Sequence, residues 1–196
     1  MNVLLVILLG CSLGAAAQDC KTVTALARMV RAKTAQELSA ARDQAGESYG
    51  ARLVSAYRWF QLQPEIKAHA ESLLSLIPKT DAEQEVVMTL ADALCDQESP
   101  ADMIALSGVR EGLSRELTLA VRRAPDFLLT YVRYSFIAVK DPHSDYAVQM
   151  VTVCQKLRPA FLHAVAQLGD EDRRVFTNRI LNVRNCAPIA RPEADN

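Results

Sequence analysis

The sequence predicts an all-α protein, a single domain of about nine or ten antiparallel helices. Only 7 of its 196 residues are glycine and half are hydrophobic, and residues of high helix propensity recur along the whole chain. Apolar residues repeat with the 3.6-residue period of amphipathic helices, and no strand-like alternation of useful length interrupts them. Prolines and N-capping residues divide the chain into pieces of helical length.

Amphipathic segments in the amino-terminal half are expected to form five helices. They cover residues 19–32, 34–47, 48–62, 64–77 and 81–95. Thr34 and Glu37 have the spacing of a capping box, in which each side chain accepts a hydrogen bond from a free backbone amide. Gly46 and Gly50 make the next junction ambiguous, so the second and third segments are either two helices or one kinked helix.

Prolines mark the boundaries of several further helices. The expected segments cover residues 100–106, 107–124, 125–139, 145–157, 159–168 and 171–183. Pro64, Pro100 and Pro125 each stand where a helix is predicted to begin, because the first turn of a helix tolerates the missing amide hydrogen. No linker long enough to divide the chain separates these segments, so residues 18–187 are interpreted as one helical domain and residues 188–196 as a loose tail.

The amino terminus has the pattern of a cleavable signal peptide covering residues 1–17. An apolar run at residues 3–9 leads to Ala15 and Ala17, an Ala-x-Ala arrangement typical of signal peptidase substrates. The stretch is shorter than the roughly 20 apolar residues that a bilayer-crossing helix needs, so no transmembrane span is expected after cleavage. Two alternatives remain: Cys11 ends a lipobox and carries a lipid anchor, or the segment is retained, since no lysine or arginine precedes it.

The balance of charge excludes one broad class of partner. Lysine and arginine total 22 and aspartate and glutamate total 23, which gives a net charge of −1. A nucleic-acid-binding protein would show a basic face, so no nucleic-acid partner is expected. The sequence also contains no nucleophile elbow, no zinc-protease motif and no glycine-rich phosphate loop, and therefore no cofactor is predicted.

Cleavage after residue 17 would leave four cysteines in the exported protein: Cys20, Cys95, Cys154 and Cys186. An even number of cysteines in an oxidising compartment predicts two disulfides. The favoured pairing joins Cys20 to Cys95 and Cys154 to Cys186, because helices that are close in the chain usually pack together. In the alternative, Cys95 and Cys154 are buried thiols. Four scattered cysteines with three histidines do not form a zinc motif, so no metal site is predicted.

A shift of 34 residues aligns part of the carboxy-terminal half with itself. It pairs Pro125 with Pro159, Phe127 with Phe161 and Leu128 with Leu162. The period resembles the tetratricopeptide repeat: Ala147 and Pro159 match its small residue and its closing proline, and Leu168 with Gly169 matches its Leu-Gly pair, whereas Tyr131 replaces its usual tryptophan. The resemblance implies a short tetratricopeptide- or HEAT-like solenoid of helical hairpins. The alternative is ordinary antiparallel helices with coincidental spacing.

The densest polar cluster of the sequence is the turn that contains Asp141, His143 and Asp145. An imidazole between two carboxylates offers a base with an orienting acid, so these three residues are the catalytic candidates. The competing interpretation is structural, because Asp-Pro and Ser-x-Asp sequences also form turns and cap helices.

Aromatic side chains supply the candidates for binding. Trp59 lies off the apolar stripe of its helix, beside Tyr57, and could anchor a peptide or glycan in a groove. Arg133 stands among the aromatic residues of a later helix and is the third candidate. A second packing contact is the alternative role for Trp59.

These observations favour an exported protein of the periplasm or the extracellular space that binds an envelope protein or peptide, or serves as a scaffold there. The absence of a catalytic motif and the helical architecture are the grounds for this hypothesis. One alternative is a small exported hydrolase or metal-dependent enzyme that uses the turn at His143. Another is a structural or stress protein of the envelope.

Overall fold

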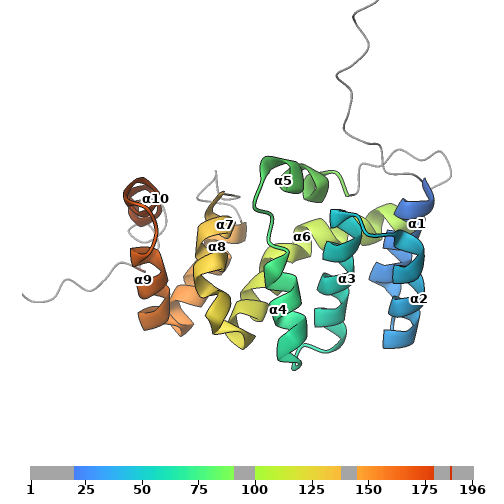
Figure 1. Ribbon diagram of the computed structural model, residues 1–196, viewed down its shortest axis with the longest axis horizontal. Coiled ribbons are helices and arrows are strands. Elements are labelled where there is room, and N and C mark those ends of the chain that lie inside the picture. The colour runs from blue at the N-terminus through green and yellow to red at the C-terminus, as the bar shows by residue number, and fades with distance from the viewer. Residues whose placement is uncertain (1–19, 91–99, 138–144, 179–185, 187–196) are drawn as a thin grey trace, which may run out of the picture.

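The computed structural model describes residues 20–90, 100–137, 145–178 and 186 (Figure 1). These residues form ten α-helices and one short 3₁₀ helix and include no strand, which confirms the predicted all-α class. The elements are α1 (Cys20–Arg31), α2 (Ala35–Ala45), α3 (Tyr49–Leu62), α4 (Lys67–Ser75), α5 (Asp81–Met88), α6 (Pro100–Arg123), η1 (Pro125–Phe127), α7 (Leu128–Ile137), α8 (Asp145–Lys156), α9 (Arg158–Ala166) and α10 (Asp170–Phe176).

The helices lie side by side along the long axis of the molecule, with α1 and α2 at one end and α9 and α10 at the other (Figure 1). The longest helix, α6, passes behind this row. Its 24 residues extend roughly 36 Å at 1.5 Å per residue, and it contacts α1, α3, α4, α7 and α8. Because so many helices pack on it, α6 is the central element of the apolar core.

The core is a single cluster of buried apolar side chains. Its largest completely buried members are aromatic: Phe60 of α3, Tyr131 of α7, Phe161 of α9 and Phe176 of α10. Phe161 and Phe176 pack against each other with ring centroids 5.9 Å apart. In the carboxy-terminal part α6 packs on α8 and α7 packs on α9.

Short polar side chains set the ends of α2 and α3. The hydroxyl of Thr34 accepts a hydrogen bond from the amide of Glu37 at 3.2 Å, and the Glu37 carboxylate accepts one from the amide of Lys33 at 2.7 Å. After α2, Gly46 adopts a φ of 73°, which glycine reaches without strain, and the chain turns. Ser48 then caps α3. The segments at 34–47 and 48–62 are therefore two separate helices.

The end of α1 is held by a side chain from α3. The guanidinium of Arg58 donates two hydrogen bonds, at 2.9 and 2.5 Å, to the carbonyl oxygen of Ala32. The last carbonyls of a helix have no partner within it, so this contact satisfies one of them and fixes the position of α1 on α3.

Two predicted helix boundaries are wrong. Pro64 does not start a helix, because the chain from Gln63 to Ile66 forms a turn closed by a hydrogen bond of 3.2 Å, and α4 begins at Lys67. The break expected near residue 106 is also absent: α6 is continuous, since Leu106 and Val109 are both buried in the core on its inner face. At Pro125, where a helix was expected to begin, the chain forms η1 and continues directly into α7.

Cys154 of α8 and Cys186 form a disulfide, with their Cα atoms 6.3 Å apart. Both residues are buried, and the bond joins Cys186 to α8. This half of the predicted pairing is confirmed. Cys20 begins α1, but its side chain and the whole of Cys95 lie outside the described residues.

The predicted signal peptide, residues 1–17, and the predicted tail, residues 188–196, also lie outside the described residues. Within the described part, no helix has the length and apolar character needed to cross a membrane.

Candidate functional site

Of the three catalytic candidates, Asp141 and His143 lie outside the described residues. Asp145 is the first residue of α8, and its side chain is likewise not described. Among the side chains that are described, no group of three or more histidines, cysteines, aspartates or glutamates is placed to hold a metal ion. The remaining candidates for a site are therefore the surfaces of the described helices.

Tyr57 is buried between α3 and α6. Its hydroxyl lies 3.5 Å from the carbonyl oxygen of Gly108, to which it donates, and accepts a hydrogen bond from Gln61 at 3.0 Å. Gln61 also donates to Glu116 at 3.2 Å, and Arg115 contacts the same carboxylate at 3.0 Å. Burial raises the pKa of the Tyr57 phenol above its ordinary value, and the negative charge of Glu116 raises it further. The phenol is thus engaged inside the protein.

Gly112 makes this close packing of α3 on α6 possible. A Cβ atom at position 112 would lie 2.5 Å from the hydroxyl oxygen of Tyr57, well inside van der Waals contact. The absence of a side chain lets the phenol lie directly against the backbone of α6.

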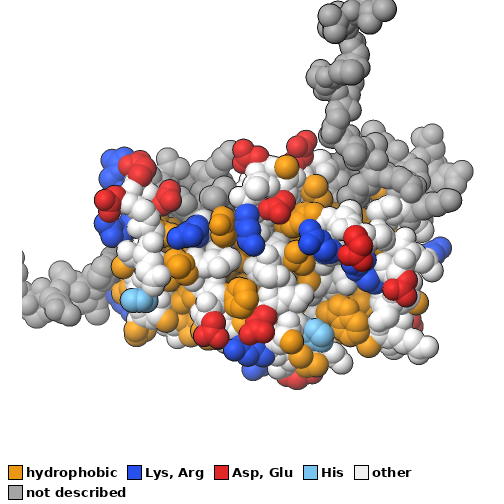
Figure 2. Space-filling view, viewed as in Figure 1, with side chains coloured by type: hydrophobic (Ala, Val, Ile, Leu, Met, Phe, Trp, Pro, Cys, Tyr) orange, Lys and Arg blue, Asp and Glu red, His pale blue; other side chains and the backbone are white. Residues whose placement is uncertain are grey.

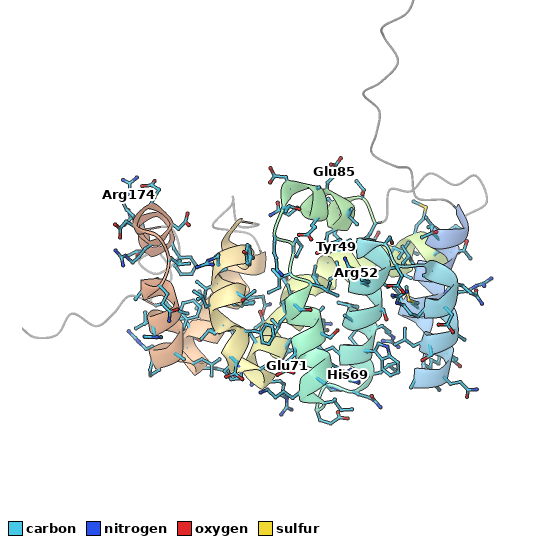
Figure 3. All side chains as sticks on the ribbon, in the orientation of Figure 1. Tyr49, Arg52, His69, Glu71, Glu85 and Arg174 are labelled. Atoms are coloured by element: carbon cyan, nitrogen blue, oxygen red, sulfur yellow. A yellow bond between two sulfur atoms is a disulfide. The ribbon has the colours of Figure 1, made fainter. Side chains whose placement is uncertain are left out.

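Trp59 is half-buried and stacks on His69 of α4. The ring centroids are 5.2 Å apart and the planes meet at 22°. Gln63 lies 2.9 Å from the His69 imidazole and fixes its orientation. Figure 3 shows His69 at the edge of the molecule where α3 leads into α4. One face of the indole is therefore covered by another side chain of the protein.

Arg133, the third binding candidate, is exposed on α7. Neither a hydrogen bond nor an ion pair joins its side chain to another described residue. Arg133 lies on α7, whereas Tyr57 and Trp59 lie on α3.

A groove of about 270 Å³ lies between the end of α3 and the end of α6, and we call it the α3–α6 groove. It is lined by Phe60, Pro64, Leu119, Arg122 and Arg123. Phe60 is almost completely buried and closes the floor, whereas Leu119 is 39% exposed. Both arginines are exposed, and neither is paired with any described residue.

The charge of the two arginines is not neutralised by the nearest acid in the sequence. Asp126 follows Arg123 by three positions, but its carboxylate is 3.1 Å from the ammonium group of Lys67 on α4. Lys67 also contacts Glu71 at 3.3 Å. The positive ends of Arg122 and Arg123 thus face solvent beside an apolar floor, an arrangement that suits an anionic group attached to an apolar one.

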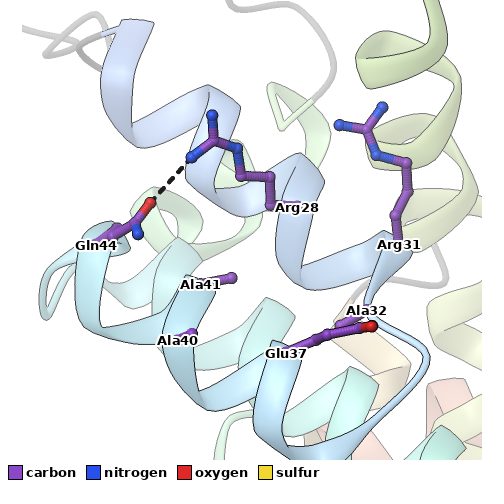
Figure 4. A pocket seen from close by; sticks show the side chains of 7 residues that line it. All are labelled: Arg28, Arg31, Ala32, Glu37, Ala40, Ala41 and Gln44. Carbon is purple, nitrogen blue, oxygen red and sulfur yellow. Dashed lines mark hydrogen bonds between the residues drawn. The ribbon is translucent and has the colours of Figure 1, made fainter.

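A second groove, of about 360 Å³, lies between α1 and α2 and is named the α1–α2 groove (Figure 4). It also contains two arginines, but both are engaged. Arg28 donates to Gln44 at 3.0 Å, and Arg31 lies 2.5 Å from the buried carboxylate of Asp102 at the start of α6. The rest of its lining consists of three alanines, Glu37 and Gln44, and it includes no large apolar side chain.

Basic side chains do not dominate the face of the molecule shown in Figure 2. Lysines and arginines alternate there with acidic and apolar side chains instead of gathering into one patch. This face therefore presents no extended basic surface.

No known protein family matches the chain, and no curated protein and no solved structure is significantly similar to it. The α3–α6 groove is therefore identified from its geometry alone. Its arginines have one signature in the sequence: neither has an acid three or four positions before it on the helix. The apolar part of the groove has no such signature in the sequence, because Phe60 and Leu119 come from distant parts of the chain.

Proposed function

We propose that this chain is an exported protein- or peptide-binding module of the cell envelope. The observation that carries the proposal is the α3–α6 groove, where exposed Leu119 and two unpaired arginines lie together above an aromatic floor. A single exposed apolar residue needs no explanation, but apolar surface beside unneutralised charge is typical of a recognition site. The groove is below the roughly 300–1,000 Å³ of small-molecule pockets, which favours a protruding segment of another protein.

The disulfide supports the location. Bonds between cysteines form and persist in the periplasm and in extracellular space, and they are rare in the cytosol. The Cys154–Cys186 bond therefore agrees with the export that the sequence pattern of residues 1–17 predicts. Together, the groove and the disulfide favour a binding role outside the cytosol.

Site-specific photo-crosslinking in cells tests this proposal. A photoreactive phenylalanine analogue replaces Leu119 in the groove or, as the control, Glu85, which is exposed on α5. Figure 3 shows Glu85 at the opposite edge of the molecule from His69. We expect a discrete protein adduct in the envelope fraction from position 119 and not from position 85. The absence of adducts at position 119, or equal adducts at both positions, would contradict a binding role for the groove.

A further inference from the structure

We infer that the α3–α6 groove recognises an acidic peptide segment that carries one large apolar side chain. This inference rests on the proposed binding function and names the chemistry of the partner. It follows from three features of the groove: its size, the state of its arginines and the acids that surround it.

The size of the groove fits a single side chain. Its volume of about 270 Å³ holds one leucine- or phenylalanine-sized group with some water, but not a longer ligand. Phe60 forms the floor, and Pro64 and Leu119 form apolar walls, so a polar group placed against these three residues would lose its water without gaining hydrogen bonds. The group that contacts this part of the groove is therefore apolar.

The arginines select a carboxylate next to that group. A guanidinium presents a planar fork of donors that matches the two oxygens of a carboxylate. Arg122 and Arg123 carry this fork at the edge of the groove with no partner among the described residues. An acid within one to three residues of the apolar side chain would reach them.

Neighbouring acids make an extended anionic surface a poor partner. Asp126, 77% exposed, and Glu71, 38% exposed, flank Lys67 on the adjoining surface. A nucleic acid or the head groups of a membrane would place phosphates over these carboxylates as well as over the arginines. Nucleic-acid affinity also depends on many phosphate contacts, which two arginines cannot supply. A short peptide can present its charge to the arginines alone.

The probes come from a library of random heptapeptides. Each peptide is displayed with its amino terminus free, and the library is screened for binding to the oxidised protein. We expect the enriched peptides to share one large apolar residue with aspartate or glutamate within three positions. The best of them is then synthesised with a fluorescent label, together with a version in which its acids are replaced by amides. Fluorescence anisotropy measures the affinity of each, alongside vesicles of phosphatidylglycerol as the alternative anionic partner.

Two double variants of equal charge separate the groove from the net charge. In R122Q/R123Q the groove loses both arginines, while K33Q/R52Q removes two exposed cations from α3 and the segment before α2. We expect the first to weaken binding of the acidic peptide about tenfold at low salt, and the second to change it less than twofold. The amide version of the peptide should bind wild-type protein about as weakly as the acidic one binds R122Q/R123Q. Circular dichroism of each variant checks that it is folded.

The outcomes distinguish this inference from the broader function. Enriched peptides without acids, or acidic peptides that bind R122Q/R123Q as tightly as wild type, overturn the acidic partner but leave a peptide-binding role intact. A library without any enrichment, together with no adduct at Leu119, contradicts both. Vesicle binding that depends on Arg122 and Arg123 and exceeds peptide binding would replace the peptide with a lipid surface.

Discussion

The two grooves of this molecule contain the same number of arginines but use them differently. In the α1–α2 groove the guanidinium groups of Arg28 and Arg31 are bound to Gln44 and Asp102, and they hold helices together. In the α3–α6 groove Arg122 and Arg123 have no described partner, while the nearby Asp126 is bound to Lys67. The number of basic residues in a groove is therefore a poor guide to its role. What matters is whether the folded chain already supplies hydrogen-bond or ion-pair partners for their guanidinium groups.

The α1–α2 groove is also the larger one, yet its apolar lining consists of alanines, whereas the smaller groove has Phe60 and Leu119. The smaller groove therefore presents larger apolar side chains beside two arginines that have no described partner. Such charges mainly add selectivity to binding. Three experiments test how the two grooves differ.

The largest effect is expected from G112A, which disturbs the packing of α3 on α6 and leaves the α1–α2 groove unchanged. The new Cβ would meet the Tyr57 hydroxyl at 2.5 Å, and overpacking of this kind costs about 1–3 kcal/mol. Urea unfolding should show this loss in the free energy of unfolding.

A second variant separates the clash from other effects of the substitution. In G112A combined with Y57F the hydroxyl is gone, and the nearest ring atom, Cζ, lies at 3.6 Å, an ordinary contact. We expect the double variant to regain most of the stability lost by G112A, helped by the higher helix propensity of alanine. If the double variant is less stable than G112A alone, the close approach of Tyr57 to α6 is not the reason for the glycine.

D102N tests the engaged arginines. Removing the charge of Asp102 breaks its ion pair with Arg31 and also removes a favourable acid from the first turn of α6, so we expect a loss of about 1 kcal/mol in the free energy of unfolding. Arg31 should also become more reactive toward a dicarbonyl reagent that modifies free guanidinium groups.

Mass spectrometry of the modified wild-type protein compares the reaction rates of the arginines in the two grooves. Arg122 and Arg123 should react several times faster than Arg28 and Arg31, and D102N should raise the rate for Arg31 alone. Equal rates for all four arginines in wild type would remove the basis of the comparison.

The smallest effect is expected in the pH dependence of the free energy of unfolding, to which Tyr57 contributes at the contact between α3 and α6. Burial, assisted by Glu116, raises the pKa of Tyr57 above its ordinary value of 10.0. Below pH 10 the phenol is protonated in both the folded and the unfolded chain, so it adds no pH dependence there. As the pH rises above 10, the unfolded chain loses this proton first, and stability falls until the folded pKa is passed.

The comparison with Y57F isolates this contribution from the other groups that titrate in the same range. Between pH 9 and pH 11, the free energy of unfolding of wild type should decrease more steeply than that of Y57F. Parallel curves for the two proteins would show that the phenol titrates in the folded state as it does in the unfolded chain.

The sequence predicted the helices well where the signal is local. Thr34 and Thr80 each stand three residues before a glutamate, and both cap a helix; at Thr80 the reciprocal hydrogen bond of the capping box is also present. At Thr34 the glutamate instead accepts from the amide of Lys33. The error at Pro64 has a local cause, the turn between Gln63 and Ile66, whereas the error within α6 has a tertiary cause. The predicted break lies close to Gly108, a poor helix former, but packing of Leu106 and Val109 in the core keeps α6 continuous.

The α3–α6 groove could not be predicted, because it depends on long-range neighbours. Phe60 and Leu119 are almost 60 residues apart, and no periodicity indicates that they meet. The state of the arginines also depends on Lys67 of α4, whose ammonium group lies 3.1 Å from the carboxylate of Asp126. Trp59 lies off the apolar stripe of its helix, and in the structure it stacks on His69 of α4. That neighbour also comes from another helix.

The position of α6 has a consequence for biogenesis. The helices α1, α3 and α4 pack on α6, which begins only at residue 100, and α7 and α8 pack on it as well. A nascent chain that ends before α6 therefore exposes much of its future core, and neither half can complete its folding alone. We expect such a chain to stay loosely structured and accessible to holding chaperones until α6 has been synthesised. A polypeptide with this delay is well suited to threading through a narrow translocation channel before it folds.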